Sequence, residues 1–265
     1  MDSFTMIMPT YKRTDIMLKL LQHYQAVPQL KHIVVVWNNI GQEPPRKTWE
    51  SLGPHRVSVL FKEQTLNRVN NRMLPASEID TEAVLMLDDD LQISSPDVTF
   101  AFSVWKRYPD KLVGFVPRTH VTTAPGVYGY SYNTEAAGGV RYSMTLTGAA
   151  FIHRRYLQLY REQPRQVIDM VDNGQNCEDI TMNFIVALWL AKQQDGGESK
   201  ARAAAVYVKA LDMQNLEGDT KSGYHGLWHR KDHMEQRSYC LNQLAKTYGS
   251  MPLGYSNLML TRKHQ

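Results

Sequence analysis

Three consecutive aspartates, Asp88 to Asp90, directly follow the apolar run AVLML at residues 83–87. Two carboxylates about 4 Å apart repel each other by ~1 kcal/mol in water and by ~4 kcal/mol near a protein surface. Because side chains alternate along a strand, we expect Asp88 and Asp90 to point to one side and Asp89 to the other. Oxygen ligands grouped in this way favour magnesium or manganese. The alternative is a solvated turn or a cluster that caps the next helix.

The apolar run before the aspartates is one of several that predict a sheet. Candidate strands lie at residues 4–8, 32–39, 57–61 and 83–87, and a candidate helix at 16–27 has Thr14 and Asp15 as its caps. Strands that alternate with helices indicate a doubly wound α/β fold, in which ligands bind beyond the carboxyl ends of the strands. Polar residues follow those ends at 10–13, 38–39 and 88–90.

The rest of the chain continues the alternation. We expect helices at residues 98–108 and 177–192, the second amphipathic, a long helix within 223–249, and strands at 112–117, 142–152 and 205–211. Ser95 and Pro96 are the expected N-cap and first residue of the helix at 98–108. Gly148 lies inside the strand at 142–152. Residues 122–142 indicate a mobile loop or a ribbon, and residues 193–205 indicate an exposed or disordered segment.

Composition limits the class of ligand. The 265 residues are 43% hydrophobic and carry a net charge of +4, with a pI of about 8.9. This charge is too small to indicate nucleic-acid binding, and it suits an anionic small substrate such as a nucleotide or an acidic sugar. No apolar run reaches the roughly eighteen residues of a membrane span. The N-terminus lacks the layout of a signal peptide, which favours a cytosolic protein or a trimmed domain.

Two cysteines, Cys177 and Cys240, leave two alternatives open. They are too few for a four-ligand zinc site. They could be two buried free thiols. They could also form a disulfide across a long loop, which would contribute about 4 kcal/mol to stability and require an oxidising compartment.

An ordered set of motifs makes the chain similar to a known family. Over essentially its whole length it resembles the exostosin-like glycosyltransferases, in particular the stand-alone α-1,4-N-acetylhexosaminyltransferase type. The matching motifs are WNN (37–39), LDDD (87–90), FVPRTH (115–120), MTLTGAAF (144–151), NCEDITMNF (176–184) and QRSYC (236–240). Departures occur at Pro9, where a polar residue is usual, at Glu178, where the stand-alone type has Asp, and in segment 124–140.

The resemblance implies a GT-A-type nucleotide-diphospho-sugar transferase fold, with a central mixed, mainly parallel sheet flanked by helices. It implies one catalytic domain over residues 1–265, of which 1–90 bind the UDP-sugar and 91–265 bind the acceptor. The implied reaction is a retaining, manganese-dependent transfer of N-acetylglucosamine or N-acetylgalactosamine in α-1,4 linkage. The implied acceptor is the glucuronate-ended linkage region of heparan sulfate precursors. The family also implies the endoplasmic reticulum or Golgi lumen, or secretion, with any anchor outside this chain. A homodimer is one candidate assembly.

The resemblance assigns the donor side as follows. An arginine near the nucleotide is matched by Arg13. The family positions that contact uracil, ribose or diphosphate are matched by Asn38, Asn67 and Arg72. Nucleotide- and sugar-facing carboxylates are matched by Asp88 and Asp89, and the direct metal ligand is matched by Asp90. For each arginine a surface ion pair is the alternative, and for each asparagine a helix or turn cap.

The resemblance assigns an acidic pair beside the reacting centre to Glu178 and Asp179. It also assigns an arginine near the diphosphate to Arg237, and a disulfide to Cys177 and Cys240. Retention can proceed by a covalent sugar ester or by front-side attack. We favour front-side attack, in which Asp179 positions the acceptor hydroxyl or stabilises the oxocarbenium-like centre.

Aromatic side chains in the loops have two interpretations. Trp228, Tyr128 and Tyr130 could stack on sugar rings or serve only as packing anchors. His229 next to Trp228 is expected to be a structural histidine.

Three other functions are alternatives. A UDP-sugar-binding protein without turnover is disfavoured because the acidic motifs and Arg237 are intact. Phosphoryl transfer is disfavoured because the P-loop pattern is missing. A polyanion-binding module would depend on short basic clusters at 153–155 and 262–264, which a solvated surface also explains.

Overall fold

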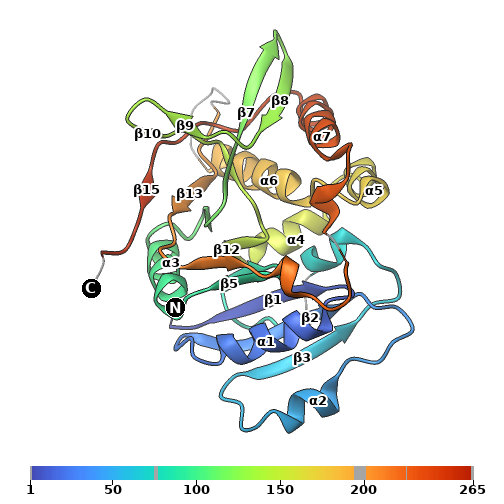
Figure 1. Ribbon diagram of the computed structural model, residues 1–265. Helices are drawn as coiled ribbons and strands as arrows, with labels where there is room; N and C mark the ends of the chain where they lie inside the picture. Colours follow the sequence, from blue (N-terminus) through green and yellow to red (C-terminus); the bar gives the residue numbers. More distant parts are fainter. Residues whose placement is uncertain (1, 75–76, 194–200, 225, 264–265) are drawn as a thin grey trace.

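The computed structural model describes residues 2–74, 77–193, 201–224 and 226–263. Across these residues the central element is an eight-stranded sheet of order β15-β13-β6-β12-β4-β1-β2-β3 (Figure 1). Its strands are β1 (Phe4–Thr10), β2 (Leu30–Trp37), β3 (Ser58–Glu63), β4 (Ala83–Leu87), β6 (Leu112–Gly114), β12 (Ala149–His153), β13 (Ala205–Val208) and β15 (Met259–Leu260). Only β12 runs antiparallel to its neighbours in this sheet, β4 and β6. The expected mixed, mainly parallel α/β fold is confirmed.

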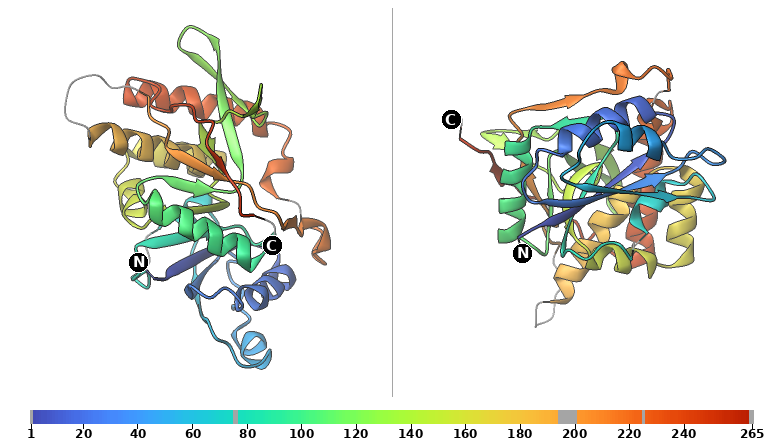
Figure 2. Two further views of the ribbon diagram at one scale, coloured as in Figure 1. Left: turned by 90° about the vertical axis from the view of Figure 1, so that its left-hand side faces the viewer. Right: turned by 90° about the horizontal axis from the view of Figure 1, so that it is seen from below.

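Apolar side chains fill both faces of the sheet, because successive residues of a strand point to opposite sides. On one face, Phe4, Met6 and Met8 of β1 pack with helices α1 (Thr14–Tyr24) and α3 (Ser95–Arg107). Ile7 packs on the other face with α4 (Arg155–Arg161), α6 (Glu178–Lys192) and α7 (His233–Tyr248). Helices therefore cover both sides of the sheet (Figures 1 and 2).

Shorter elements complete the fold. They are α2 (Arg46–Ser51), η1 (Val69–Met73), β5 (Leu91–Ile93), β7 (Pro117–Ala124), β8 (Val127–Ser131), β9 (Glu135–Ala136), β10 (Gly139–Val140), β11 (Met144–Thr145), α5 (Arg165–Gly174), β14 (Met213–Asn215), η2 (Glu217–Asp219) and η3 (Leu227–His229). The segment at 122–142 is a ribbon built from β7 to β10. Helices α4 and α5 were not predicted, although Pro164 just before α5 is a usual start signal.

The predicted strand at 142–152 is wrong as a continuous element. Its first part, β11, pairs with β7, and its second part, β12, joins the central sheet. Gly148 lies between them, and its carbonyl accepts a hydrogen bond from Asp88 N at 2.8 Å. A Cβ at Gly148 would collide with the Asp88 carboxylate. The strand is interrupted here because the backbone of Gly148 lies against Asp88, the first of the three aspartates.

Three local predictions need correction. Helix α6 is not amphipathic, because Asp179 to Ala187 are all buried between α4, α7 and β11. Helix α3 is capped by Ser94, whose hydroxyl accepts a hydrogen bond from Asp97 N at 3.3 Å, and not by Ser95. Helix α1 begins at Thr14 without a side-chain cap. The Asp15 carboxylate instead accepts a hydrogen bond from Lys221 N at 2.8 Å.

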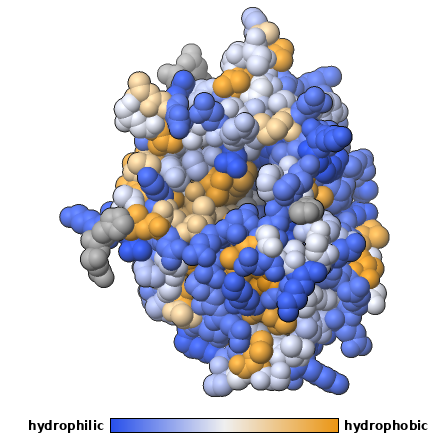
Figure 3. All heavy atoms as spheres, in the orientation of Figure 1, coloured by the Kyte–Doolittle hydropathy of each residue, from blue (hydrophilic) through white to orange (hydrophobic). Residues whose placement is uncertain are grey.

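The surface in the view of Figure 3 is mostly hydrophilic, with apolar residues only in scattered patches. Among the helices of the described residues, none combines the length and the apolar character that crossing a bilayer requires. Of the predicted exposed segment 193–205, residues 194–200 lie outside the described part of the chain.

Candidate active site

The three aspartates do not alternate as expected. Strand β4 ends at Leu87, and residues 88–90 form a turn in which Leu91 N donates to Asp88 O at 3.3 Å. In this turn Asp89 and Asp90 both face Arg13, whose Nη1 donates to Asp89 Oδ1 at 3.0 Å and to Asp90 Oδ2 at 2.7 Å. The alternation rule fails because it holds only while the backbone stays extended.

One guanidinium serves three buried carboxylates at this point. Besides the two aspartates, Arg13 Nη2 donates to Glu217 Oε1 at 3.0 Å. Burial, followed by the charge of Asp88, raises the pKa of Asp90 to about 7. Burial also raises the pKa of Asp89 to about 6. The site therefore holds more negative charge than Arg13 can neutralise.

The donor set at this turn fits a divalent metal. Asp89 Oδ2 is buried and has no hydrogen-bond partner in the described part of the chain. Hard carboxylate oxygens are the ligands that magnesium and manganese prefer. The described residues contain no group of three or more His, Cys, Asp or Glu side chains arranged to hold a metal ion. A metal here would thus take few ligands from the protein, and substrate and water would supply the rest. This agrees with the expectation that Asp90 is the one direct metal ligand.

Arg72 joins the aspartates to the second acidic pair. It lies on η1, and its Nη2 pairs with Asp88 Oδ1 while its Nη1 lies 3.4 Å from Glu178 Oε1. Burial alone would lower the pKa of Arg72, but the charges of Asp88 and Glu178 outweigh burial and raise it above its ordinary value. Two segments that are distant in sequence, at 88–90 and 178–179, are therefore parts of one site.

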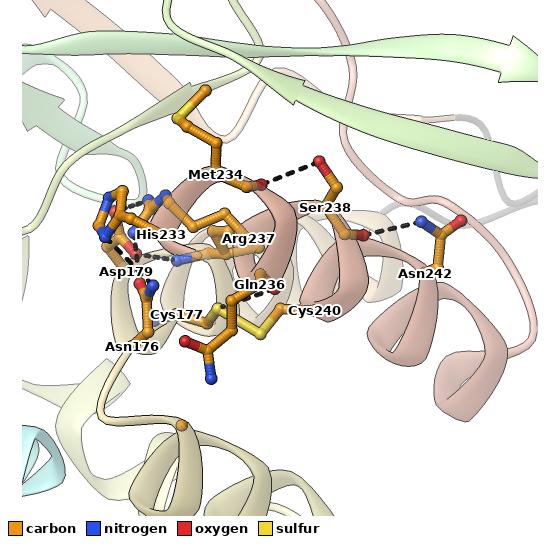
Figure 4. Close-up of a disulfide and its surroundings, with 12 residues drawn as sticks. Asn176, Cys177, Asp179, His233, Met234, Gln236, Arg237, Ser238, Cys240 and Asn242 are labelled. Carbon is orange, nitrogen blue, oxygen red and sulfur yellow. Dashed lines mark hydrogen bonds and ion pairs between the residues drawn. A yellow bond between two sulfur atoms is a disulfide. The ribbon is translucent and has the colours of Figure 1, made fainter. Parts of the chain in front are cut away.

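Asp179 and Arg237 form a buried ion pair between α6 and α7 (Figure 4). Arg237 Nη2 pairs with Asp179 Oδ2, and Nη1 donates to Asn176 Oδ1 at 2.9 Å. The guanidinium also lies over the ring of Tyr130, 4.3 Å from its centroid. Tyr130 is thus a packing partner of Arg237.

The disulfide between Cys177 and Cys240 is present, with Cα atoms 6.4 Å apart. It joins the residue before α6 to the middle of α7, beside the pair Asp179–Arg237 (Figure 4). The resemblance had implied this pairing, and it is confirmed.

The two predicted amides lie in different surroundings. Asn38, just beyond β2, is buried, and its Oδ1 accepts a hydrogen bond from Asn71 Nδ2 at 2.7 Å. Asn67 is exposed and lines a polar cavity of about 370 Å³ with Arg68, Arg165 and Asp172 among others. Among the described residues, no hydrogen bond or ion pair links Asn67 to the ion pairs of Arg13 and Arg72.

Comparison with known proteins decides the family. The glycosyl transferase family 64 domain matches residues 4–264. The chain belongs to glycosyltransferase family 64. It is 52% identical to Exostosin-like 2 of Homo sapiens over 99% of this chain and 78% of that protein. It is 35% identical to Exostosin-2 of Mus musculus over 95% of this chain and 33% of that protein. It is 30% identical to Glycosylinositol phosphorylceramide mannosyl transferase 1 of Arabidopsis thaliana over 96% of this chain and 75% of that protein. The expected exostosin-like glycosyltransferase is confirmed.

Sequence reasoning missed three residues in this family 64 site. Glu217 belongs to no recognisable motif, and its partner Arg13 lies 204 positions earlier in the sequence. Asn176 orients Arg237 and precedes the motif CED, so its position in NCED was a usable signal. Asn71 contacts Asn38 from within the amide-rich run at 64–72. The structural role expected for His229 stays a prediction, and its Nε2 lies 3.0 Å from Glu217 Oε2.

Breaking the disulfide is expected to loosen the family 64 site as well as the fold. The bridge closes a loop of 63 positions, for which loop entropy predicts about 4 kcal/mol of stability. The double variant Cys177→Ser/Cys240→Ser should melt well below the wild type and lose activity under conditions where both remain folded. Thermal unfolding with and without reductant, followed by activity at low temperature, checks this. Equal melting temperatures would contradict it.

Glu178 is expected to lower the stability of the fold as pH rises from acidic to neutral values. Burial, followed by the charge of Asp179, raises its pKa from 4.5 to about 7. The folded state therefore binds a proton that the unfolded state has released, and stability falls as pH rises from about 4.5 to about 7. The variant Glu178→Gln should gain roughly 2 kcal/mol over the wild type between pH values of about 5 and about 8. Denaturant unfolding at both pH values measures the difference. The exposed Glu50→Gln is the control, and a pH-independent gain in Glu178→Gln would contradict the assignment.

Proposed function

We propose that this family 64 glycosyltransferase moves N-acetylglucosamine or N-acetylgalactosamine from a UDP-sugar to a glucuronate-ended glycosaminoglycan linkage-region acceptor. The transfer forms an α-1,4 linkage with retention of configuration, and it depends on manganese. The observation that carries the proposal is a set of two adjoining ion-pair clusters beyond the carboxyl ends of β1 and β4. Arg13 binds Asp89 and Asp90 in one cluster, and Arg72 binds Asp88 and Glu178 in the other. The identity to Exostosin-like 2 supports the choice of substrate class.

The donor would lie along residues 1–90. Asn38 and Asn67 are suited to the uracil or ribose, because amides both donate and accept hydrogen bonds. The guanidinium of Arg72 can bind phosphate oxygens with two parallel N–H groups. Asp88 and Asp89 would face nucleotide and sugar, and Asp90 would hold the metal. Manganese bound there would neutralise the charge that develops on the departing diphosphate.

Asp179 is the residue best placed to act on the acceptor or the reacting carbon. Its Oδ1 accepts a hydrogen bond from Ile180 N at 2.8 Å, and Arg237 holds its Oδ2. Both contacts fix the orientation of the carboxylate. Such a group can orient the acceptor hydroxyl or stabilise positive charge at the sugar carbon, as front-side attack requires. Arg237 faces Asp179, so we assign it the orientation of this carboxylate and keep a contact with the diphosphate as a prediction.

The disulfide supports an oxidising location. Such bonds persist in the secretory pathway and outside the cell, and they are rare in the cytosol. We therefore propose the endoplasmic reticulum or Golgi lumen, or secretion, over the cytosol. The homodimer and the acceptor role of residues 91–265 stay predictions.

A transfer assay tests the function. Purified protein would be incubated with manganese, a glucuronate-ended acceptor, and UDP-N-acetylglucosamine, UDP-N-acetylgalactosamine or GDP-mannose. We expect UDP release that requires the acceptor, and an α-anomeric product by NMR. GDP-mannose is included because of the similarity to the Arabidopsis thaliana mannosyl transferase. Turnover of GDP-mannose alone, or a β-anomeric product, would overturn the proposal.

A further inference from the structure

Glu217 is a buried carboxylate that the proposed chemistry does not use. Its side chain is 8% exposed, and it binds four N–H groups. Oε1 accepts hydrogen bonds from Arg13 Nη2 at 3.0 Å and from Gly226 N. Oε2 accepts from Trp228 Nε1 at 3.1 Å and lies 3.0 Å from His229 Nε2. One oxygen therefore faces the donor-side arginine, and the other faces an aromatic pair.

The donor side of this contact reaches the metal residue. Arg13, which Glu217 holds by Nη2, binds Asp90 Oδ2 by Nη1 at 2.7 Å. The preceding residue, Leu216, also donates its backbone N–H to Asp90 O at 2.7 Å. Glu217 is thus tied to Asp90 by two routes, one through a side chain and one through the backbone.

The backbone around Glu217 is anchored to the start of α1. Lys221 N and Thr220 Oγ1 donate to the Asp15 carboxylate at 2.8 and 3.2 Å. The Tyr224 ring packs edge-on against Tyr11, with centroids 5.3 Å apart. These contacts hold residues 220–224 next to the donor-side loop at residues 11–13.

Gly226 allows the close approach of Glu217 and Arg13. A Cβ at this position would lie 2.9 Å from Arg13 Nη2, 2.9 Å from Glu217 Oε1 and 3.0 Å from Trp228 Cδ1. The first two distances are shorter than real Cβ contacts, and the third is at the tight limit of such contacts. A side chain at this position would therefore displace the ends of Arg13 and Glu217 and disturb the contact between them.

Trp228 is the exposed end of this network. The residue is 56% exposed, although its indole N–H is fixed by Glu217. Its ring packs on His229 with centroids 3.7 Å apart. A large aromatic ring with one polar atom held and much of its surface open is suited to binding a ligand that is apolar on one face, such as a sugar ring.

We propose that Glu217 is a positioning residue that links the donor site to the Trp228 platform, so that binding of metal and UDP at Asp90 and binding of the acceptor sugar at Trp228 favour each other. The proposal rests on the proposed function for the identity of the two ligands. By linkage, the effect of donor on acceptor affinity equals the effect of acceptor on donor affinity. A loss of the Glu217 contacts should reduce both effects together.

The substitution Glu217→Gln tests this link. Four N–H groups need two accepting oxygens, and the amide offers only one. We expect the acceptor KM at saturating donor to rise about tenfold, the scale of one lost hydrogen bond to a charged group, with kcat within about twofold. Trp228→Phe keeps an aromatic ring, although a smaller one, and removes the N–H. It should raise the acceptor KM to a similar extent, and the double variant should be no worse than either single one. Additive effects in the double variant, or an unchanged acceptor KM in Glu217→Gln, would overturn the proposal.

A second readout is independent of turnover. Trp37, Trp49 and Trp105 are buried and Trp189 is half-buried, whereas Trp228 is 56% exposed. Iodide therefore quenches Trp228 most strongly, and the difference between the wild type and Trp228→Phe gives the contribution of Trp228. UDP with manganese should reduce this quenching in the wild type and not in Glu217→Gln, while Glu50→Gln behaves as the wild type. If the wild type transfers sugar but shows no such change, the link is wrong and the proposed function stands. If the quenching change occurs without transfer, the link stands and the proposed function is wrong.

Discussion

Replacing Asp90 by asparagine is expected to lower kcat/KM by roughly a thousandfold and to remove most of the dependence of the rate on manganese. Asp90 is buried in a turn with Asp88 and Asp89, and its pKa is raised first by burial and then by the like charges around it. A divalent metal would relieve this crowding and bridge to the diphosphate, whereas an amide binds hard cations much more weakly than a carboxylate. Initial rates against manganese concentration, for wild type and variant, measure the effect.

The matched control for this substitution is Asp80→Asn. Asp80 is an exposed carboxylate paired with Lys31, so its loss should change the rate less than about twofold. Melting temperatures separate a catalytic defect from misfolding. If Asp90→Asn kept a rate within about tenfold of the wild type and the same manganese response, Asp90 would not be the metal residue.

Replacing Asp179 by asparagine is expected to lower kcat by about 100- to 1000-fold while donor affinity stays within about threefold. The substitution keeps the size of the side chain and one oxygen for Ile180 N, but it removes the charge that faces Arg237. A carboxylate that acts only on the acceptor hydroxyl or the reacting carbon affects the transition state more than the binding of UDP. Steady-state kinetics together with calorimetric titration of UDP separate these two effects.

Asp110→Asn is the control for Asp179, because Asp110 forms a surface pair with Arg155 at 3.4 Å. Arg237 retains Asn176 as a partner in the Asp179 variant, so we expect it to remain folded. A kcat close to that of the wild type would remove Asp179 from the mechanism. A parallel loss of UDP binding would instead assign Asp179 to the donor site.

The sequence predicted those parts of the site that follow directly from local pattern. The apolar run at β4 delivers the aspartates to the edge of the sheet where ligands bind, because a short β-branched and apolar segment before a polar turn is a reliable strand signal. The sequence also predicted that Glu178 and Asp179 begin helix α6 and that a long helix contains Arg237. The pairing of Cys177 with Cys240 came from resemblance, since two cysteines alone left it open.

The errors arose where contacts between distant segments override local pattern. The prediction that Asp89 points away from Asp90 was wrong because the strand ends at Leu87, directly before the three aspartates. Arg13 then binds the carboxylates of both Asp89 and Asp90 on one side. The break near Gly148 comes from the approach of the Asp88 backbone and carboxylate, which lies 60 positions earlier in the sequence. Glu217 had no signal at all, because its importance comes from four partners that the fold brings to it.

Calorimetric titration of UDP with manganese and with a chelator tests the central claim most directly. The claim is that a divalent ion at Asp90 holds the diphosphate of the donor. It predicts that UDP binds roughly a hundredfold more tightly with manganese than in chelator, and that Asp90→Asn binds UDP equally weakly in both conditions. Equal affinity of the wild-type protein for UDP in manganese and in chelator would contradict the claim.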